Sequence, residues 1–173
     1  MNKPAFLSAV ALVFVALPKC YPQVNPPTTF VDRGACPFEC CTYREWKTEK
    51  TTIAYARADR RSKRIGKFTA GSKVIALTGI VYSMPRRFLA IKPYGKYKPG
   101  DIILGYTSYG EGSYKVWFRG RMYTEGLEED GPWGKWLDKE HRSTWWIKIK
   151  SEDGWVGWTN QGENFSGSDA CGG

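Results

Sequence analysis

Residues 144–159 read TWWIKIKSEDGWVGWT, and this stretch decides the fold class. Its two halves, Thr144–Lys150 and Gly154–Thr159, are short and rich in β-branched and aromatic residues, and the first alternates along the chain with a period of two, which is the pattern of a half-buried β-strand. Asp153-Gly154 stands between the halves, and an Asp-Gly pair at this place favours a tight hairpin turn. The stretch therefore predicts an antiparallel hairpin that is rich in tryptophan.

Strand signals of the same kind recur through the chain. Short runs rich in β-branched and aromatic residues lie between Gly- and Pro-containing turns, at Thr51–Arg57, Ile65–Phe68, Lys73–Thr78, Arg87–Lys92, Asp101–Thr107 and Tyr114–Arg119. No apolar pattern with a period of 3.6 is sustained, although the segment Gly126–Arg142 has room for a short helical turn. About eight short strands in about 120 residues indicate an all-β fold, either a small barrel or a sandwich.

The amino-acid composition agrees with an all-β fold. The chain has 173 residues, enough for one domain or two very small ones. Eight Trp and ten Tyr stand against three Met and one His, and aromatic side chains favour strands and half-buried surfaces. Nineteen Gly and ten Pro supply the turns that many short strands need.

The first 20 residues have the form of a secretory signal peptide. Lys3 precedes an uncharged apolar run, Ala5–Leu17, which is shorter than the roughly 20 residues that span a bilayer. We therefore expect export, to the periplasm or the medium, with no membrane span after signal removal; a buried or anchoring helix is the alternative. No clear cleavage site precedes Cys20. Lipid anchoring there is not expected, because Pro18 and Lys19 do not fit a lipobox.

The remaining cysteines, Cys36, Cys40, Cys41 and Cys171, form an even set that we expect to be disulfide-bonded. Three pairings are open, and geometry disfavours a bond between the adjacent Cys40 and Cys41. A bridge from this cluster to Cys171 would join the two ends of the domain. Zinc is the competing explanation, but His141 is the only histidine available as a further ligand. No metal or cofactor is predicted.

A family resemblance emerges from two separated stretches. Residues 53–77, IAYARADRRSKRIGKFTAGSKVIAL, resemble the opening half of bacterial Src-homology-3-like (SH3-like, SH3b) domains, and residues 144–159 resemble their closing hairpin. The residues that carry the likeness are Ser62, Ile65, Gly66, Gly71, Val74, Gly154, Trp155 and Val156. The lead-in GACPFECCTYREW and the DAC tail are similar to a cysteine-bearing, uncharacterised subset of exported proteins with such domains. The resemblance implies an SH3-like barrel.

The departure from the SH3-like pattern is an intervening segment of about 65 residues, from Gly79 to Ser143. It is either a large β insertion in one barrel or the start of a second SH3-like lobe that ends with the closing hairpin; two closely packed lobes are slightly favoured. The expected organisation is a signal peptide (1–20), a Pro-rich spacer (21–35), a first lobe (36–95), a second lobe or insertion with the closing hairpin (96–165), and a tail tied by Cys171 (166–173).

Alternation assigns faces to the two aromatic strands. Trp145, Ile147 and Ile149 share one side of their strand, and Val116 and Phe118 share one side of theirs; both sets are expected in the core. The opposite sides each place a tryptophan among cations. We expect a cationic aromatic binding surface made of Lys115, Trp117, Arg119, Trp146, Lys148 and Lys150. Half-buried packing of both tryptophans is the simpler alternative.

The net charge points to anionic ligands. The formal charge is +9, and without Lys3 and Lys19 there remain 24 basic and 17 acidic residues, a charge of +7. Such a surface attracts anionic polymers of several kinds, although solubility alone would also account for it. Export makes nucleic acid a poor candidate, so we expect a cell-wall polymer or an envelope protein as partner. The oligomeric state is left open.

Catalytic signals are weak. A thiol dyad of Cys40 or Cys41 with His141, and a carboxylate pair of Asp101 and Glu111 acting on a glycan, are the two arrangements that the residue types allow. Bridged cysteines and solvated turn carboxylates explain the same residues more simply. The expected function is therefore a non-catalytic binding module of the envelope or secreted space. The alternatives are an envelope-acting hydrolase or its regulatory domain, and a secreted effector or inhibitor of a partner protein.

Overall fold

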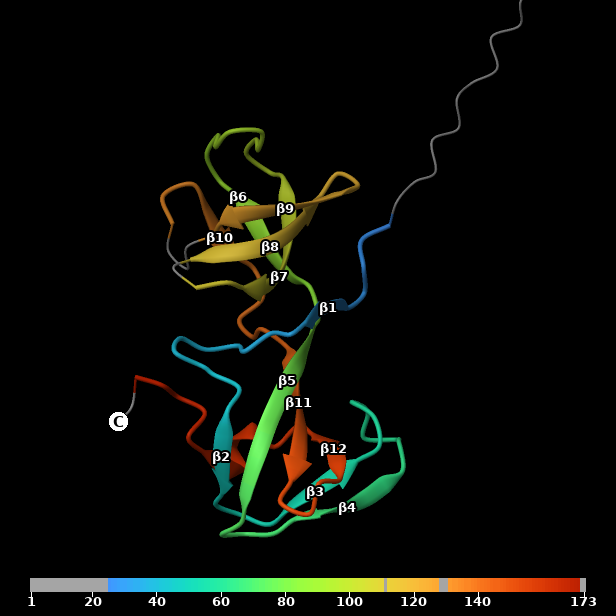
Figure 1. Cartoon of the computed structure of the whole chain (residues 1–173). Coiled ribbons are helices and arrows are strands. Elements are labelled where there is room, and N and C mark those ends of the chain that lie inside the picture. The colour runs from blue at the N-terminus through green and yellow to red at the C-terminus, as the bar shows by residue number, and fades with distance from the viewer. Residues whose placement is uncertain (1–24, 111, 128–130, 172–173) are drawn as a thin grey trace, which may run out of the picture.

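A computed structural model of the protein describes residues 25–110, 112–127 and 131–171 (Figure 1). Within these ranges the chain is all-β, as predicted, and the only helical element is one 3₁₀ turn, η1 (Gly162–Asn164). The segment Gly126–Arg142, which had room for a short helical turn, holds a strand in its described part. No helix among the described residues is long and apolar enough to cross a membrane. The predicted signal peptide lies outside the described ranges.

Two sheets lie at opposite ends of the molecule (Figure 1). The first is a curled eight-stranded sheet with the order β13-β2-β5-β11-β12-β3-β4, and β1 also pairs with β5. Its strands are β1 (Phe30–Arg33), β2 (Glu45–Thr48), β3 (Thr52–Tyr55), β4 (Arg64–Phe68), β5 (Lys73–Ser83), β11 (Ser143–Ser151), β12 (Val156–Thr159) and β13 (Phe165–Ser166). The long strands β5 and β11 run side by side through its middle.

The second sheet has five strands in the order β10-β6-β7-β8-β9. They are β6 (Arg86–Ala90), β7 (Ile102–Ser108), β8 (Ser113–Phe118), β9 (Arg121–Gly126) and β10 (Gly134–Trp136). The chain thus leaves the first sheet after Ser83 and returns to it at Ser143, where β11 pairs with β5. This connectivity is that of a β insertion between two parts of one sheet. The expected lobe boundary between residues 95 and 96 falls inside the insertion, between β6 and β7.

Each of the eight predicted strands has a counterpart, from β3 to β8 and in β11 and β12. The strands that sequence analysis missed are β1, β2, β9, β10 and β13. Four of these have four residues or fewer, and β9 reads RMYTEG, in which polar residues hide the alternation. Strand β1 lies within the expected Pro-rich spacer, where only its pairing with β5 reveals it as a strand.

The predicted Asp-Gly turn is confirmed. Gly154 has a φ of +85°, which glycine adopts without steric cost, and its N–H donates to the carbonyl of Ser151 at 3.0 Å. The N–H of Ser151 in turn donates to the carbonyl of Trp155 at 2.9 Å. The turn therefore sets the register in which Lys150 faces Val156 across β11 and β12.

Each sheet has its own hydrophobic core, and the predicted inward faces are confirmed. Ile147 and Ile149 are fully buried in the first core, and Trp145 packs against it. The other members of that core are Trp46, Ala54, Phe68, Val74, Ala76 and Phe165. Val116 and Phe118 are buried in the second core with Phe88, Ala90, Tyr97, Ile103, Leu127 and Trp133.

Two disulfides hold the segment between β1 and β2, one of them within that segment and the other to the C-terminal tail. Cys36 bonds to Cys41, and Cys40 bonds to Cys171 across 131 residues. The expectation of bridged cysteines is met, and the structure selects one of the three open pairings. The tail is also held by its backbone, since the N–H of Ala170 donates to the carbonyl of Cys40 at 2.8 Å. The Arg44 guanidinium donates to two further tail carbonyls, those of Gly167 and Asp169.

We predict that the two disulfides stabilise the fold unequally. In the chain-entropy model the Cys40–Cys171 bridge, which closes the far longer loop, is worth about 2–3 kcal/mol more than Cys36–Cys41. Chemical unfolding of the double variants Cys40→Ser/Cys171→Ser and Cys36→Ser/Cys41→Ser measures the difference directly. Equal losses in the two variants would contradict this assignment.

Candidate functional site

The residues expected to form one cationic aromatic surface lie on two different sheets. Lys115 and Trp117 belong to β8 in the second sheet, and Arg119 follows that strand; Trp146, Lys148 and Lys150 belong to β11 in the first. The two halves of the predicted surface are therefore described separately.

In the second sheet, Trp117 lies on the face opposite the core. It is half-buried, directly across from Leu104 on β7 and Met122 on β9. Arg119 does not extend that strand: it has a φ of +46° and forms the turn into β9 with Gly120. Its guanidinium pairs with Asp101 at 3.0 Å. Arg119, one of the two cations predicted to flank Trp117, is thus already paired with a carboxylate.

In the first sheet, Trp146 is on the expected face but is not exposed. It retains only 4% of its accessible surface, and its ring packs edge-on against Tyr55, with centroids 5.6 Å apart. Sequence alternation could not show this burial, because Tyr55 comes from β3, about 90 residues away in the chain. Lys148, two residues along, lies over the ring of Trp158 with its Nζ 5.9 Å from the centroid.

A pocket of about 600 Å³ opens over Trp146. Its walls come from the loop between β3 and β4, from β5, from the start of β11 and from the residue after β12. The lining residues are Ala58, Asp59, Arg60, Arg61, Tyr82, Thr144, Trp146 and Asn160. Tyr82 and Thr144 face each other in the register of β5 and β11. The pocket therefore combines an aromatic floor and wall with cations at the rim.

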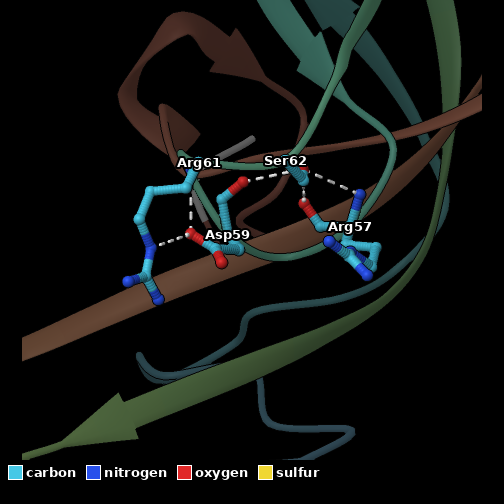
Figure 2. A network of polar contacts seen from close by, with 4 residues as sticks. All are labelled: Arg57, Asp59, Arg61 and Ser62. Carbon is cyan, nitrogen blue, oxygen red and sulfur yellow. Dashed lines mark hydrogen bonds and ion pairs between the residues drawn. The ribbon is translucent and has the colours of Figure 1, made fainter.

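The covering loop is held in shape by its own polar groups (Figure 2). Ser62 is buried, and its hydroxyl donates to the Asp59 carbonyl at 2.7 Å and accepts from the Arg57 N–H at 3.2 Å. The Asp59 carboxylate accepts from the backbone N–H of Arg61 at 2.9 Å and lies 3.4 Å from its Nε. These hydrogen bonds lower the pKa of Asp59, and the bond from the backbone N–H of Arg61 has the largest effect. The Asp59 carboxyl is therefore ionised at neutral pH.

The rim of the pocket is strongly basic. Residues 57–64 read RADRRSKR, with five cations and one carboxylate. With its side-chain oxygen turned toward the guanidinium, Asn160 accepts two hydrogen bonds from Arg60, at 2.7 and 3.1 Å. This contact orients Arg60 beside the pocket, and the side chain of Arg61 remains exposed. Guanidinium groups placed in this way suit carboxylate or phosphate ligands.

The described lining of the pocket over Trp146 holds few groups that could act as an acid or a base. Asp59 is the only carboxylate among its described lining residues, and none of them is a histidine or a cysteine. The paired acid and base that hydrolases use is therefore missing from this lining.

The two catalytic arrangements considered from sequence gain no support. Cys40 and Cys41 are both in disulfides, so the thiol dyad with His141 is wrong, and the His141 ring contacts the Tyr106 carbonyl instead. The pKa of Asp101 is lowered, first by the N–H of Lys98 and then by Arg119, as expected of an ionised turn residue. Its suggested partner Glu111 lies outside the described residues.

Sequence analysis did not select Arg60, Arg61, Tyr82 or Asn160. The basic run at residues 57–64 was visible, but no local pattern indicates that it lies beside a tryptophan about 85 residues away in the chain.

Comparisons with known proteins found no matching family model, no matching curated protein and no matching solved structure.

We predict that Ser62 keeps the loop over Trp146. Replacing Ser62 by Ala removes the hydroxyl that bonds Asp59 and Arg57, at a cost of about 1 kcal/mol. Amide hydrogen exchange at Arg57 and Arg61 should become faster, while exchange in β5 stays as it was. Ser72→Ala is the matched control, because Ser72 makes a similar short bond to Thr69 in a different, exposed turn. Unchanged exchange at Arg57 in the Ser62 variant would refute this role.

Proposed function

We propose that this protein is an exported, non-catalytic binding protein of the cell envelope, built on an SH3-like barrel with a β insertion. The observation that carries the proposal is the pocket over Trp146, in which an aromatic floor lies beside the guanidinium groups of Arg60 and Arg61. The natural ligand is an anionic component of the cell wall.

Support for the barrel and for export comes from separate features. The first sheet is curled, and the residues of the SH3-like motif fall on it in order, from Ser62 in the loop before β4 to Val156 in β12. Two disulfides fit an oxidising compartment, where such bonds persist. The apolar run near the start of the chain fits a secretory signal.

The charge distribution explains why an anionic ligand is favoured. Net positive charge raises the local concentration of polyanions, and the cationic loop at residues 57–64 concentrates that field at the pocket. Arg60 and Arg61 then offer planar donors to carboxylate or phosphate oxygens. The half-buried ring of Tyr82 offers an apolar surface to the rest of the ligand, and Trp146, which is almost fully buried, closes the bottom of the pocket.

We predict that binding to purified, insoluble cell wall depends on the two pocket arginines. Arg60→Ala/Arg61→Ala should weaken binding by about 10-fold or more, since the loss of even one charge-assisted hydrogen bond costs about 1.5–3 kcal/mol. Co-sedimentation over a range of salt concentrations measures the affinity, which should fall as salt rises in the wild type and fall less steeply in the variant.

The matched control is Arg121→Ala/Lys135→Ala, which removes the same charge from exposed positions on the second sheet. It should bind nearly as the wild type does. If both double variants lost affinity equally, attraction would be a property of net charge, and the pocket would not be the site. Tyr82→Ala is a further test that leaves the charge unchanged; wild-type binding by this variant would count against the aromatic wall.

A further inference from the structure

A second cavity, of about 780 Å³, lies between the two sheets. One wall comes from the end of β1 and residues 34–39 after it, together with Val81 of β5, and the other comes from residues 107–110 at the end of β7 and from Ser113 at the start of β8. In Figure 1 the end of β7 lies above the segment between β1 and β2. Junctions between structural units are common places for ligand sites, and the volume is in the range of small-molecule pockets.

Two exposed aromatic rings flank this cleft, one on each wall. Phe38 keeps 41% of its accessible surface and Tyr109 keeps 52%. Phe38 is fixed in place, because its ring meets Trp145 edge-on with centroids 5.9 Å apart and because the Cys36–Cys41 bond closes the loop that carries it. A ring held as Phe38 is held offers an apolar stacking surface to a ligand at little cost in conformational entropy.

Polar residues also line the cleft. They are Asp32 from β1, Thr107 and Ser108 from β7, and Glu39. Burial raises the pKa of Asp32, and Lys115 lowers it by a smaller amount. Burial and the nearby Asp32 charge raise the pKa of Tyr109, so its phenol is protonated and can donate a hydrogen bond.

The charges of the cleft nearly balance. Asp32 and Glu39 are offset by Arg33 in the same lining and by Lys115 close to Asp32. The carboxylates of Asp32 and Glu39 repel an anionic ligand, and the positive charges of Arg33 and Lys115 repel a cationic one. A neutral ligand meets neither repulsion. This distinguishes the cleft from the pocket over Trp146, whose rim is basic.

We propose that the cleft binds a neutral, hydroxyl-rich saccharide. Sugar rings have apolar C–H faces, which fit Phe38 and Tyr109, and hydroxyl edges, which fit a carboxylate and hydroxyl lining. Asp32 accepts hydrogen bonds from ligand hydroxyls, and Thr107 and Ser108 both donate and accept. The site is separate from the pocket over Trp146, so it does not depend on the function proposed there.

The experiment is a titration of the full, oxidised protein with neutral oligosaccharides, followed by two-dimensional amide NMR. Tetra-N-acetylchitotetraose, cellotetraose and maltotetraose serve as probes at millimolar concentration. At least one of them should shift amide signals of residues 32–39 and 107–110. Phe38→Ala and Tyr109→Ala should each weaken binding by roughly 3- to 10-fold. The control Tyr94→Ala should not, because Tyr94 is equally exposed but stacks on Trp133 away from the cleft.

The outcomes separate the two sites. Arg60→Ala/Arg61→Ala should bind the neutral probe as the wild type does, whatever becomes of its binding to cell wall. Asp32→Asn should weaken binding of the probe with the dispersed spectrum retained. The proposal is overturned if none of the three probes shifts these residues, or if the shifts occur at residues 57–64 instead. Equal weakening by Tyr94→Ala and Tyr109→Ala would overturn it as well.

Discussion

The structure depends on the antiparallel pairing of β5 with β11. The register runs from Val74 opposite Ser151 to Ser83 opposite Ser143, and it joins two strands that are separated by the whole second sheet. Because this pairing is so distant in sequence, the entropy of closing the loop must be offset by burial along both strands. Ile147 and Ile149 supply that burial on one face, and Trp146 beside Ile80 supplies it on the other.

The centre of this pairing is shaped by close contact. Gly79 lies opposite Ile147, and a side chain there would overlap the Tyr43 hydroxyl and the Trp145 indole nitrogen. Tyr43 donates to the carbonyl of Ala35, and the indole N–H of Trp145 donates to Tyr43 at 3.3 Å. The absence of a side chain at Gly79 therefore lets the segment before the disulfide loop dock against the sheet. The same docking forms one wall of the cleft between the sheets.

The two candidate sites use the same frame in different ways. The pocket over Trp146 lies on the outer face of the first sheet, where a loop rich in cations crosses β5 and β11. The cleft lies where β1 and the disulfide loop meet the turn of the inserted sheet. Their linings differ in charge, so the ligands proposed for the two sites differ in charge as well.

Local patterns account for the part of the structure that sequence analysis predicted. A period of two residues in TWWIKIK determines which side chains point inward whatever the partner strand is, and Asp153-Gly154 favours a tight turn by its own backbone preferences. The all-β class, eight of the strands, the inward faces and the bridging of the cysteines follow from such signals. The charges of the loop at residues 57–64 were also evident from composition.

Tertiary structure alone decided which strands are neighbours and what covers each face. Trp146 alternates as an outward residue, yet it is buried, and its ring packs against Tyr55 of β3. Arg60 meets Asn160, and Tyr109 and Phe38 line the same cleft, although in each case the two residues are 70 or more positions apart in the chain. The pairing of Cys40 with Cys171 likewise joins two residues that are far apart in the chain, and no local pattern predicts it. Alternation and turn propensity act over a few residues, whereas these contacts depend on the register of β5 with β11, which no local pattern specifies.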